Sequence, residues 1–594
     1  MSQQQNNDMQ KNFYRASAAD FGKIPGSPIA YWVSEKLFSC FQIDKLRDVA
    51  DAKQGMATSD NGRFLRFWHE VSEEQLFLDC ASAAESEHRT EKWYAYNKGG
   101  EFRRWFGNNE YVVNWQSNGV ELKAFVEEIN KLRPGGRLKN QEYYFRDSIT
   151  YSSLSSGLFS ARYNPVGFLF DTKGSCIFPV SVSKSNLLGL LNSNVAQAFL
   201  NILCPTLDYS SIGINAIPVR LPEINEVTDR LIEVAKKDWD SNELSWDFKR
   251  LPLLQPEFSQ LLLERCYQKL RAFMQQRSCE MQRLEEDNNR LFIEVYDLQD
   301  ELTPAVPLSE ITLTCNPHYR YGGNLTDEER EARLQSDTIS ELISYAIGCM
   351  MGRYSLDCEG LVYAHAGNEG FKALVEEGAY STFAADEDGI LPLTSDNWFP
   401  DDVAARFEAF IRTVWGAETL EENLQFIADS LCLSAIKPVK KGGETARETI
   451  RRYLSTQFFK DHMKTYKKRP IYWLFSSGKE KAFECLLYLH RYNEATLPRM
   501  RTEYVTPLLG QMAGRIERLR LQQAEAGTAE AKRIGKEIDT LSKQLTELRA
   551  FDDELKHHAD MRITLDLDDG VKVNYGKFGT LLSDVKAITG DKGE

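Results

Sequence analysis

Residues 142–171 read EYYFRDSITYSSLSSGLFSARYNPVGFLFD, and this stretch decides the fold class of the first part of the chain. It is rich in Tyr, Ser, Phe and Thr, and apolar residues alternate along it, which is typical of strands. Residues 167–171 and 176–180 flank a turn at 172–175 and predict a hairpin. From 186 to 203 the apolar residues change to helical spacing. The sequence therefore predicts a mixed α/β module.

Two segments upstream combine turn-forming residues with cations and aromatic side chains. Residues 55–68 read GMATSDNGRFLRFW, and residues 97–115 read NKGGEFRRWFGNNEYVVNW. Gly, Ser, Asp and Asn are turn formers, and the second segment ends in a short predicted strand at 111–115. We therefore expect loops that display Asn, Lys and Arg on a rigid sheet, where binding residues usually lie.

The chain beyond residue 225 changes to helical patterning. Residues 261–302 lack the Gly and Pro that break helices and predict one long helix or two shorter ones. Apolar residues follow 4-3 spacing from Ile534 to Leu555, and residues 512–521 with a turn at 527–528 complete a predicted coiled-coil arm. The expected fold class is α+β and multidomain: a mixed α/β domain, then a large, mainly α-helical domain with a short coiled-coil arm.

Length and composition limit the class of protein. The 594 residues predict three or four domains, with 42% hydrophobic and 27% charged residues. No apolar run approaches the ~18 residues of a membrane helix, and the N-terminus, MSQQQNNDMQ, does not match a secretory signal. The eleven cysteines form no C-x-x-C pair, and the eight histidines no metal motif. We therefore expect a cytoplasmic protein with no metal site and no membrane partner.

Charge is distributed unevenly along the chain. The net charge of −15 alone disfavours a nucleic-acid binder. Residues 91–184, however, hold 13 cations and 9 acids, a local +4, and residues 437–469 hold 11 cations and 3 acids, a local +8. The remainder carries −27, so two basic windows in an acidic chain are compatible with a DNA-binding groove. The alternative is that these charges lie on solvated helix faces.

Several of these segments carry a family resemblance. Residues 55–64, 97–115 and 142–171, together with NLLGLLNSNVAQAFLNILCPT at 186–206, resemble the target-recognition region of the PglX-type adenine-specific DNA methyltransferases of BREX phage-defence systems. Segments resembling the part that follows this region are TCNPHYRYGG (314–323), GRYSLD (352–357) and KRPIYWLFSSG (468–478). The resemblance runs in order along nearly the whole chain. The central module is also similar to the specificity domains of TaqI-like and type IIG enzymes.

The resemblance implies sequence-specific DNA recognition for the transfer of a methyl group from S-adenosylmethionine to adenine N6, which marks host DNA. In the family, a methyltransferase domain with a Gly-rich cofactor loop and an N-P-P-Y motif precedes the recognition region. We expect that domain to be missing here, whether the gene is split, frameshifted or engineered, so that the chain alone is inactive and holds no cofactor. The expected segments are a lead-in (1–22), a target-recognition domain (23–225), a helical spacer (226–335), a helical domain (336–510), and the arm with a tail (511–594).

Residues 316–319, Asn-Pro-His-Tyr, are the one candidate for a methyltransferase motif within the chain. Adenine methyltransferases need an Asn amide and a Pro carbonyl to accept the amine of a flipped adenine, and an aromatic ring to stack on it. His318 replaces the second proline, and no Gly-rich strand–loop–helix lies upstream. A structural turn is therefore the favoured interpretation, and no catalytic residue is assigned.

Arg bonds guanine and Asn bonds adenine through two hydrogen bonds each, so the two upstream loops supply candidate base readers. These are Asn61, Arg63, Lys98, Arg103 and Arg104. The alternative is that Arg103 and Arg104 pair with nearby acids and that the aromatic residues form core. Candidate phosphate contacts, which give affinity without sequence information, are Arg146, Arg162, Lys440, Lys441, Arg451, Arg452, Lys467, Lys468 and Arg469. Tyr472, Trp473 and Phe475 are candidates for stacking on unpaired bases, but a consecutive apolar run more often forms core.

Three functions remain open from the sequence. The first is DNA recognition for a methyltransferase, with double-stranded DNA, the methyltransferase half of the enzyme, other BREX proteins and acidic DNA-mimicking inhibitors as partners. The second is an intact methyltransferase that uses residues 316–319. The third is a protein-interaction scaffold that touches no DNA, which the acidic majority and the arm favour.

Overall fold

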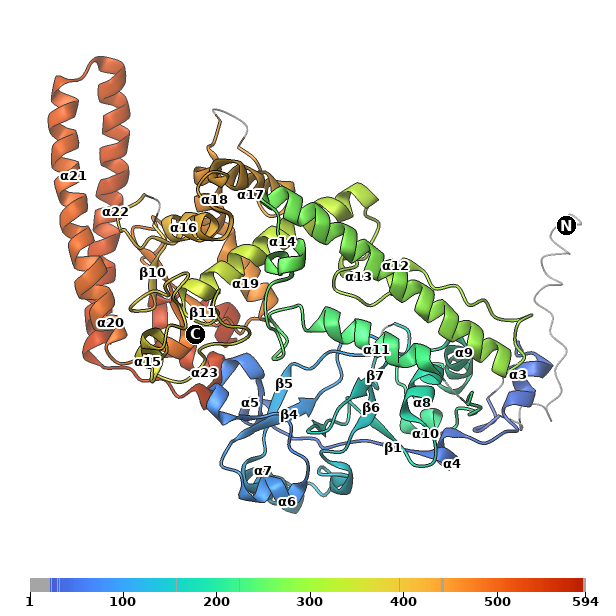
Figure 1. Cartoon of the computed structure of the whole chain (residues 1–594). Helices are drawn as coiled ribbons and strands as arrows, with labels where there is room; N and C mark the ends of the chain where they lie inside the picture. Colours follow the sequence, from blue (N-terminus) through green and yellow to red (C-terminus); the bar gives the residue numbers. More distant parts are fainter. Residues whose placement is uncertain are drawn as a thin grey trace, which may run out of the picture. The chain divides into compact units, whose positions relative to one another are not determined.

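The computed structural model describes residues 22, 24–28, 30, 32–155, 157–223, 225–394, 396–439 and 443–590 (Figure 1). The chain divides into two compact units. Unit 1 comprises residues 1–66, 75–240 and 273–323, and unit 2 comprises residues 67–74, 241–272 and 324–594. Each unit is built from three separate stretches of chain. This division cannot be compared one to one with the five consecutive segments expected from the sequence, so those segments stay a prediction.

The first sheet of unit 1 has the order β1-β9-β6-β7. Its strands are β1 (Ala50–Lys53), β9 (Cys176–Pro179), β6 (Ser148–Tyr151) and β7 (Ala161–Asn164). All neighbours are antiparallel, with Ile149 opposite both Ile177 and Tyr163. Ile149 and Ile177 are buried, as expected for strands rich in β-branched and aromatic residues.

The second sheet of unit 1 centres on β4 (Trp93–Asn97), whose residues are all buried. β5 (Tyr111–Asn114) pairs with it antiparallel, and β3 (Leu76–Phe77) and β8 (Leu169–Phe170) pair with it in parallel. β8 and β9 therefore belong to different sheets, and the predicted hairpin at 167–180 is wrong. The turn between them carries the chain from one sheet to the other.

A helix pair, not one helix, follows the sheets. α8 (Lys184–Leu191) and α9 (Asn194–Leu203) are separated at Asn192 and Ser193. The Asn192 amide bonds both backbone groups of Ala161 at 2.9 Å, and the Ser193 hydroxyl caps α9. Because that amide is committed to β7 and a Ser N-cap starts a new helix, the apolar stripe of 186–203 is divided between two helices.

Unit 1 is completed by α11 (Glu226–Trp239) and by most of α12 (Leu263–Val295), a single helix where one or two were predicted. Phe292 and Met281 of α12 are fully buried in the same apolar core as Ile149. The remaining helices of unit 1 include α3 (Glu35–Cys40), α4 (Leu46–Val49), α5 (Asn61–Phe64), α6 (Ala83–His88), α7 (Gln116–Leu132), α10 (Ser211–Asn215) and α13 (Pro317–Tyr321).

Unit 2 is mainly helical. Its helices include α14 (Asp327–Met350), α15 (Phe371–Glu376), α16 (Val403–Trp415), α17 (Leu420–Ser434), α18 (Ala446–Tyr453), α19 (Phe459–Thr465), α20 (Thr496–Arg499), α23 (Gly570–Gly576) and α24 (Val585–Thr589). A small antiparallel sheet has the order β10-β12-β11, formed by β10 (Ile390–Pro392), β12 (Glu484–Tyr488) and β11 (Tyr472–Ser476). The α+β fold class is confirmed.

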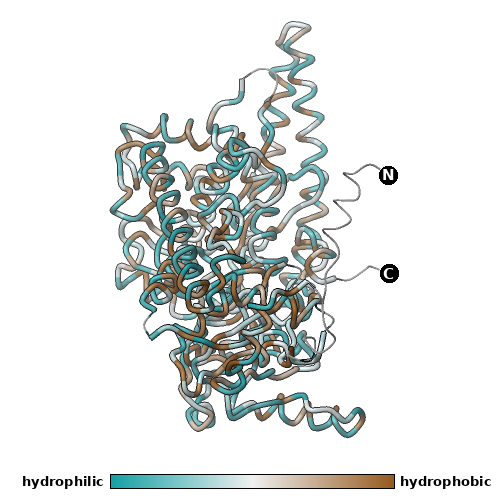
Figure 2. Tube along the Cα trace, turned by 90° about the vertical axis from the view of Figure 1, so that its right-hand side faces the viewer, coloured by the Kyte–Doolittle hydropathy of each residue, from teal (hydrophilic) through white to brown (hydrophobic). Residues whose placement is uncertain are grey.

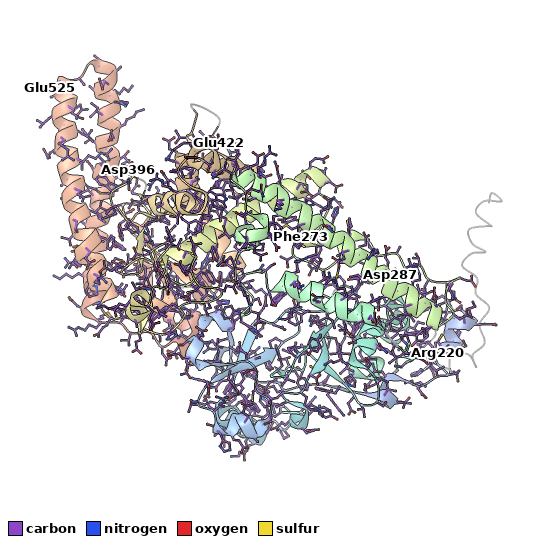
Figure 3. All side chains as sticks on the ribbon, in the orientation of Figure 1. Arg220, Phe273, Asp287, Asp396, Glu422 and Glu525 are labelled. Carbon is purple, nitrogen blue, oxygen red and sulfur yellow. The ribbon has the colours of Figure 1, made fainter. Side chains whose placement is uncertain are left out.

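The predicted coiled-coil arm is α21 (Thr506–Glu525) packed along α22 (Thr528–Asp560) (Figure 1). Glu525 lies at the far end of the arm, where the chain turns (Figure 3). Hydrophobic and hydrophilic residues alternate along both helices (Figure 2), and Ile516, Ile534 and Leu541 are buried between them. The 4-3 spacing therefore predicted this element correctly.

A fully buried arginine lies near the centre of unit 2. Arg353 has no exposed surface, and its guanidinium bonds the Tyr488 hydroxyl at 3.0 Å. His462 and His490 are also buried, and burial together with the Arg353 charge lowers the pKa of each imidazole to about 3. Both histidines are therefore neutral in the folded protein at pH 7.

Candidate nucleic-acid interface

Backbone hydrogen bonds hold together the segments of unit 1 that precede or carry the candidate base readers. The Met56 N–H donates to the Phe170 carbonyl at 2.9 Å, and the Thr172 N–H donates to the Met56 carbonyl at 3.1 Å. Gly55 permits this contact, since a Cβ there would lie 1.8 Å from the Phe170 oxygen. The Asp171 N–H in turn bonds the Asn97 carbonyl at 2.9 Å, so segment 55–58, the end of β4 and the turn at 171–174 meet.

Asn61 and Arg63 lie on α5, one turn beyond segment 55–58. The Asp60 carboxylate caps α5 by accepting from the Arg63 N–H at 3.0 Å, and Asn61 is exposed. The Arg63 guanidinium is 2.8 Å from the Glu121 carboxylate and lies over the ring of Phe125, with half its side chain exposed. Since an exposed ion pair contributes only about 0–1 kcal/mol, Arg63 can exchange Glu121 for a base at small cost.

Lys98 directly follows β4, and its side chain forms an ion pair with a buried carboxylate. Its Nζ is 2.8 Å from the carboxylate of Asp171, which is buried and also accepts from the Tyr96 hydroxyl at 2.8 Å. Gly99 and Gly100 then take positive φ values of 85° and 137°, which glycine adopts readily. Lys98 is therefore partly exposed, but its ammonium group is already committed to a buried acid.

Arg103 and Arg104 are buried, as the alternative interpretation expected. The Arg104 guanidinium bonds Glu285 of α12 at 2.7 Å and Glu310 at 3.1 Å, and the Trp105 indole N–H donates to Glu285 at 2.7 Å. Arg103 lies 3.4 Å from Asp238 of α11. Both are about 5% exposed, so neither side chain can reach DNA from this conformation of unit 1.

The burial of this segment follows from its backbone pairing with β7. The Trp105 N–H donates to the Ala161 carbonyl at 2.9 Å, and the Tyr163 N–H donates to the Trp105 carbonyl at 2.8 Å. Residues 103–106 thus extend the first sheet. Arg162, on β7, is fully buried and bonds the Arg103 carbonyl at 3.2 Å, and burial lowers the pKa of its guanidinium to about 10. Its expected role as a phosphate contact is not compatible with this burial.

Arg146 retains its candidate role. Its guanidinium lies over the rings of Tyr143 and Phe178 at 5.1 and 5.6 Å, and the residue is exposed. Stacking of this kind holds an arginine in place while leaving its N–H groups available to a phosphate.

The candidate arginines in the basic window of unit 2 are paired with acids. Arg451 bonds the fully buried Asp402 at 2.9 Å, and Arg452 bonds Glu444 through two hydrogen bonds of 2.8 Å. Arg469 is half-buried, 3.6 Å from a carboxylate oxygen of Glu70. Among the candidate phosphate contacts of this window, Lys467 and Lys468 are exposed, in the turn after α19, and Lys440 and Lys441 lie outside the described residues.

Two further sequence candidates are structural. Tyr472, Trp473 and Phe475 lie on β11 with no exposed surface, so they are core. Asn316 is buried at the N-terminus of α13: its amide N–H groups donate to the carbonyls of Leu308 and Ile311, and its oxygen accepts from the His318 N–H. All its hydrogen-bonding groups are therefore used.

The loop at 133–139 contains none of the candidate residues, although its sequence is distinctly basic. Residues 130–141 read NKLRPGGRLKNQ, four cations without an acid, within the first basic window. In the described part of the chain no three His, Cys, Asp or Glu residues come together as a possible metal site, and no helix there has the length and apolarity to cross a membrane.

Comparison with known proteins gives the family context. The chain is similar to two adenine-specific methyltransferases. It is 49% identical over 581 residues to "Adenine-specific methyltransferase BrxX" of Escherichia coli O9:H4 (strain HS), and 38% identical over 594 residues to "Adenine-specific methyltransferase PglX" of Lacticaseibacillus casei (strain Zhang). Each similarity covers 97% of this chain and 46% of the relative, so the chain spans about half the length of the curated relatives it matches. No family model matches.

Proposed function

We propose that this chain recognises a DNA sequence for an adenine N6 methyltransferase of a BREX phage-defence system. The observation that carries the proposal is that exposed Asn61 and Arg63 follow segment 55–58, which backbone hydrogen bonds hold to the turn at 171–174, and that turn to the end of β4. Asn61 and Arg63 have the chemistry for adenine and guanine edges. The similarity to adenine-specific methyltransferases over 97% of the chain supports the same function.

The residues proposed to contact DNA, taken within each unit separately, are fewer than the candidates from the sequence. Asn61 and Arg63 remain proposed base readers, and Arg146, Lys467 and Lys468 remain proposed phosphate contacts. We leave out Lys98 because its ammonium group is paired with the buried carboxylate of Asp171. We leave out Arg103, Arg104 and Arg162 because each is buried among partners of unit 1. Arg451 and Arg452 are also left out, since each holds an acid of unit 2.

S-adenosylmethionine is the cofactor implied by the relatives' names, and we propose that it is held outside this chain. Residues 316–319 do not fit the catalytic role, because the Asn316 amide is buried and bonded to its own backbone neighbours. The chain alone is therefore expected to transfer no methyl group. Incorporation of a labelled methyl group into duplex DNA by the purified chain would contradict this expectation.

The partners proposed with this function are double-stranded DNA, a methyltransferase half, and other BREX proteins in the cytoplasm. Acidic DNA-mimicking proteins should compete with duplex DNA for the same surface, whereas simultaneous binding would place them elsewhere.

The test of the proposal is a gel shift of the purified chain with duplex DNA at low salt. Binding that weakens steeply with salt is expected, since phosphate contacts release counterions. The second candidate function is a scaffold that touches no DNA. The arm favours it, because a coiled coil is a common partner-binding element. Failure of the chain to bind any duplex at 50 mM salt would favour the scaffold.

A further inference from the structure

The loop between α7 and Tyr143 is the most basic surface segment of unit 1 that no sequence-based candidate covered. Between Leu132 and Gln141 it holds three cations, Arg133, Arg137 and Lys139, and no acid. Arg133, Gly135 and Lys139 are exposed, and Arg137 is partly exposed. Among the described residues, neither Arg133 nor Lys139 forms an ion pair. The loop thus displays positive charge that the fold of unit 1 does not neutralise.

Three hydrogen bonds fix this loop beside the proposed base-reading surface. The Ala57 N–H donates to the Arg137 carbonyl at 2.8 Å, and the Asn140 amide donates to the Gln54 carbonyl at 2.8 Å. Lys139 Nζ donates to the Gln54 side chain at 3.1 Å. The loop therefore borders segment 55–58 directly, rather than being a separate charged face.

The Arg137 side chain has a different function from its neighbours. Its guanidinium bonds the Arg133 carbonyl at 2.8 Å and the Asn130 side chain, so it braces the loop from within. A guanidinium used in this way holds the loop backbone in shape. The charges available to a ligand are those of Arg133 and Lys139.

A third exposed cation lies on the opposite border of the same segment. Lys173 sits in the turn at 171–174, where its N–H bonds the Asp171 carboxylate at 2.8 Å and its carbonyl accepts from Ser153 at 2.9 Å. The adjoining Thr172 N–H bonds Met56. Hydrogen bonds to Asp171, Ser153 and Met56 therefore fix the backbone of this turn. In the described part of the chain the Lys173 ammonium group has no acidic partner.

We propose that Arg133, Lys139 and Lys173 contact phosphates of duplex DNA on the two borders of segment 55–58 and so set the register of the base-reading residues. This proposal rests on the proposed function, and it names the residues that would position the base-reading residues on the DNA. A polyanion is the occupant that fits, because three exposed cations without an acidic partner among the described residues flank segment 55–58, although the chain as a whole has a net charge of −15. Phosphate contacts fix orientation and carry no sequence information.

The test compares two triple variants of equal charge change. The first is R133Q/K139Q/K173Q. The matched control is R230Q/K237Q/R290Q, whose three exposed cations lie on α11 and α12 of unit 1 and already pair with Glu233, Glu280 or Asp287. Fluorescence anisotropy with two unrelated duplexes, from 50 to 200 mM salt, gives the dependence of affinity on salt. Thermal unfolding of each variant verifies that it is folded.

Each lost phosphate contact lowers the slope of log K against log salt by about 0.9. The first variant is therefore expected to lose about 2.7 units of slope, which reduces the change in affinity between 50 and 200 mM salt by about 40-fold, equally for both duplexes. The control should keep the slope of the unmodified chain. An unmodified chain that binds neither duplex would overturn the proposed function and this inference together. DNA binding with an unchanged slope in the first variant would overturn this inference alone.

Discussion

The substitution R104M tests whether Arg104 is part of a buried ion-pair network or a base reader. In R104M, the buried Glu285 carboxylate still accepts a hydrogen bond from the Trp105 indole but loses its ion pair with Arg104. The second partner of Arg104, Glu310, is partly exposed and stays hydrated. Removing one member of a buried ion pair costs about 3–5 kcal/mol. Burial already raises the pKa of Glu285, so the unpaired carboxyl of the variant takes up a proton at a higher pH than in the native chain. The loss should therefore be largest at pH 8 and smaller at pH 5.

The chain has two compact units, so a single unfolding transition is not the appropriate measurement. Hydrogen exchange of the amides of Trp105 and Tyr163 reports the local stability of the sheet edge, and a loss of about 3 kcal/mol accelerates exchange by about 100-fold. R104M/E285Q, which removes both charges, should exchange more slowly than R104M. If R104M exchanged like the native chain and changed the preferred DNA sequence instead, Arg104 would be a base reader and the structural assignment would be wrong.

The remaining predictions concern three other sites. In H490Q, the free energy of unfolding of unit 2 should fall less on acidification than in the native chain. The folded pKa of about 3 lies below the unfolded value of ~6.5, so the native chain loses about 2 kcal/mol between pH 7 and pH 5 through this histidine. Hydrogen exchange of the buried amides of unit 2 at both pH values, corrected for intrinsic exchange, measures the difference. N316A should lower stability by about 1–2 kcal/mol, since it removes a helix cap and one of the two hydrogen bonds that each of the Leu308 and Ile311 carbonyls accepts. A stable N316A that abolished methyl transfer in a reassembled enzyme would restore a catalytic role. L548A should destabilise α22 by about 2–5 kcal/mol, because Leu548 is fully buried, whereas L521A, at a residue 71% exposed, should have little effect; hydrogen exchange of the amides of α21 and α22 measures both.

Local periodicity predicted those elements whose partners lie close by in sequence. The arm is one example, because its core residues recur every three or four positions and its two helices are joined by a short turn. β5 is another, at the predicted position 111–115. The hairpin at 167–180 failed because adjacent strands can join different sheets, and the partners of β8 and β9 lie far away in sequence.

The same limit applies to the candidate site. Nothing near Arg104 in sequence shows that Glu285 will pair with it, since 181 positions separate them. A cluster of cations and aromatic residues is equally compatible with a nucleic-acid surface and with a buried network. Conversely, the loop at 133–139 is visible in the sequence as a basic run without acids. Its position beside segment 55–58 depends on the hydrogen bond from the Ala57 N–H to the Arg137 carbonyl, which the sequence does not show.

Selection from randomised duplexes tests the central claim most directly. The chain, with a methyltransferase half added where the complex requires it, is incubated with a duplex pool, and the bound fraction is sequenced. We predict enrichment of one short site, with R63Q relaxing the preference at a single base pair at a cost of about 1–3 kcal/mol on that site. R133Q/K139Q/K173Q should bind more weakly while selecting the same site. Binding without enrichment of any sequence, or no binding at all, would contradict the proposal that this chain recognises DNA sequence.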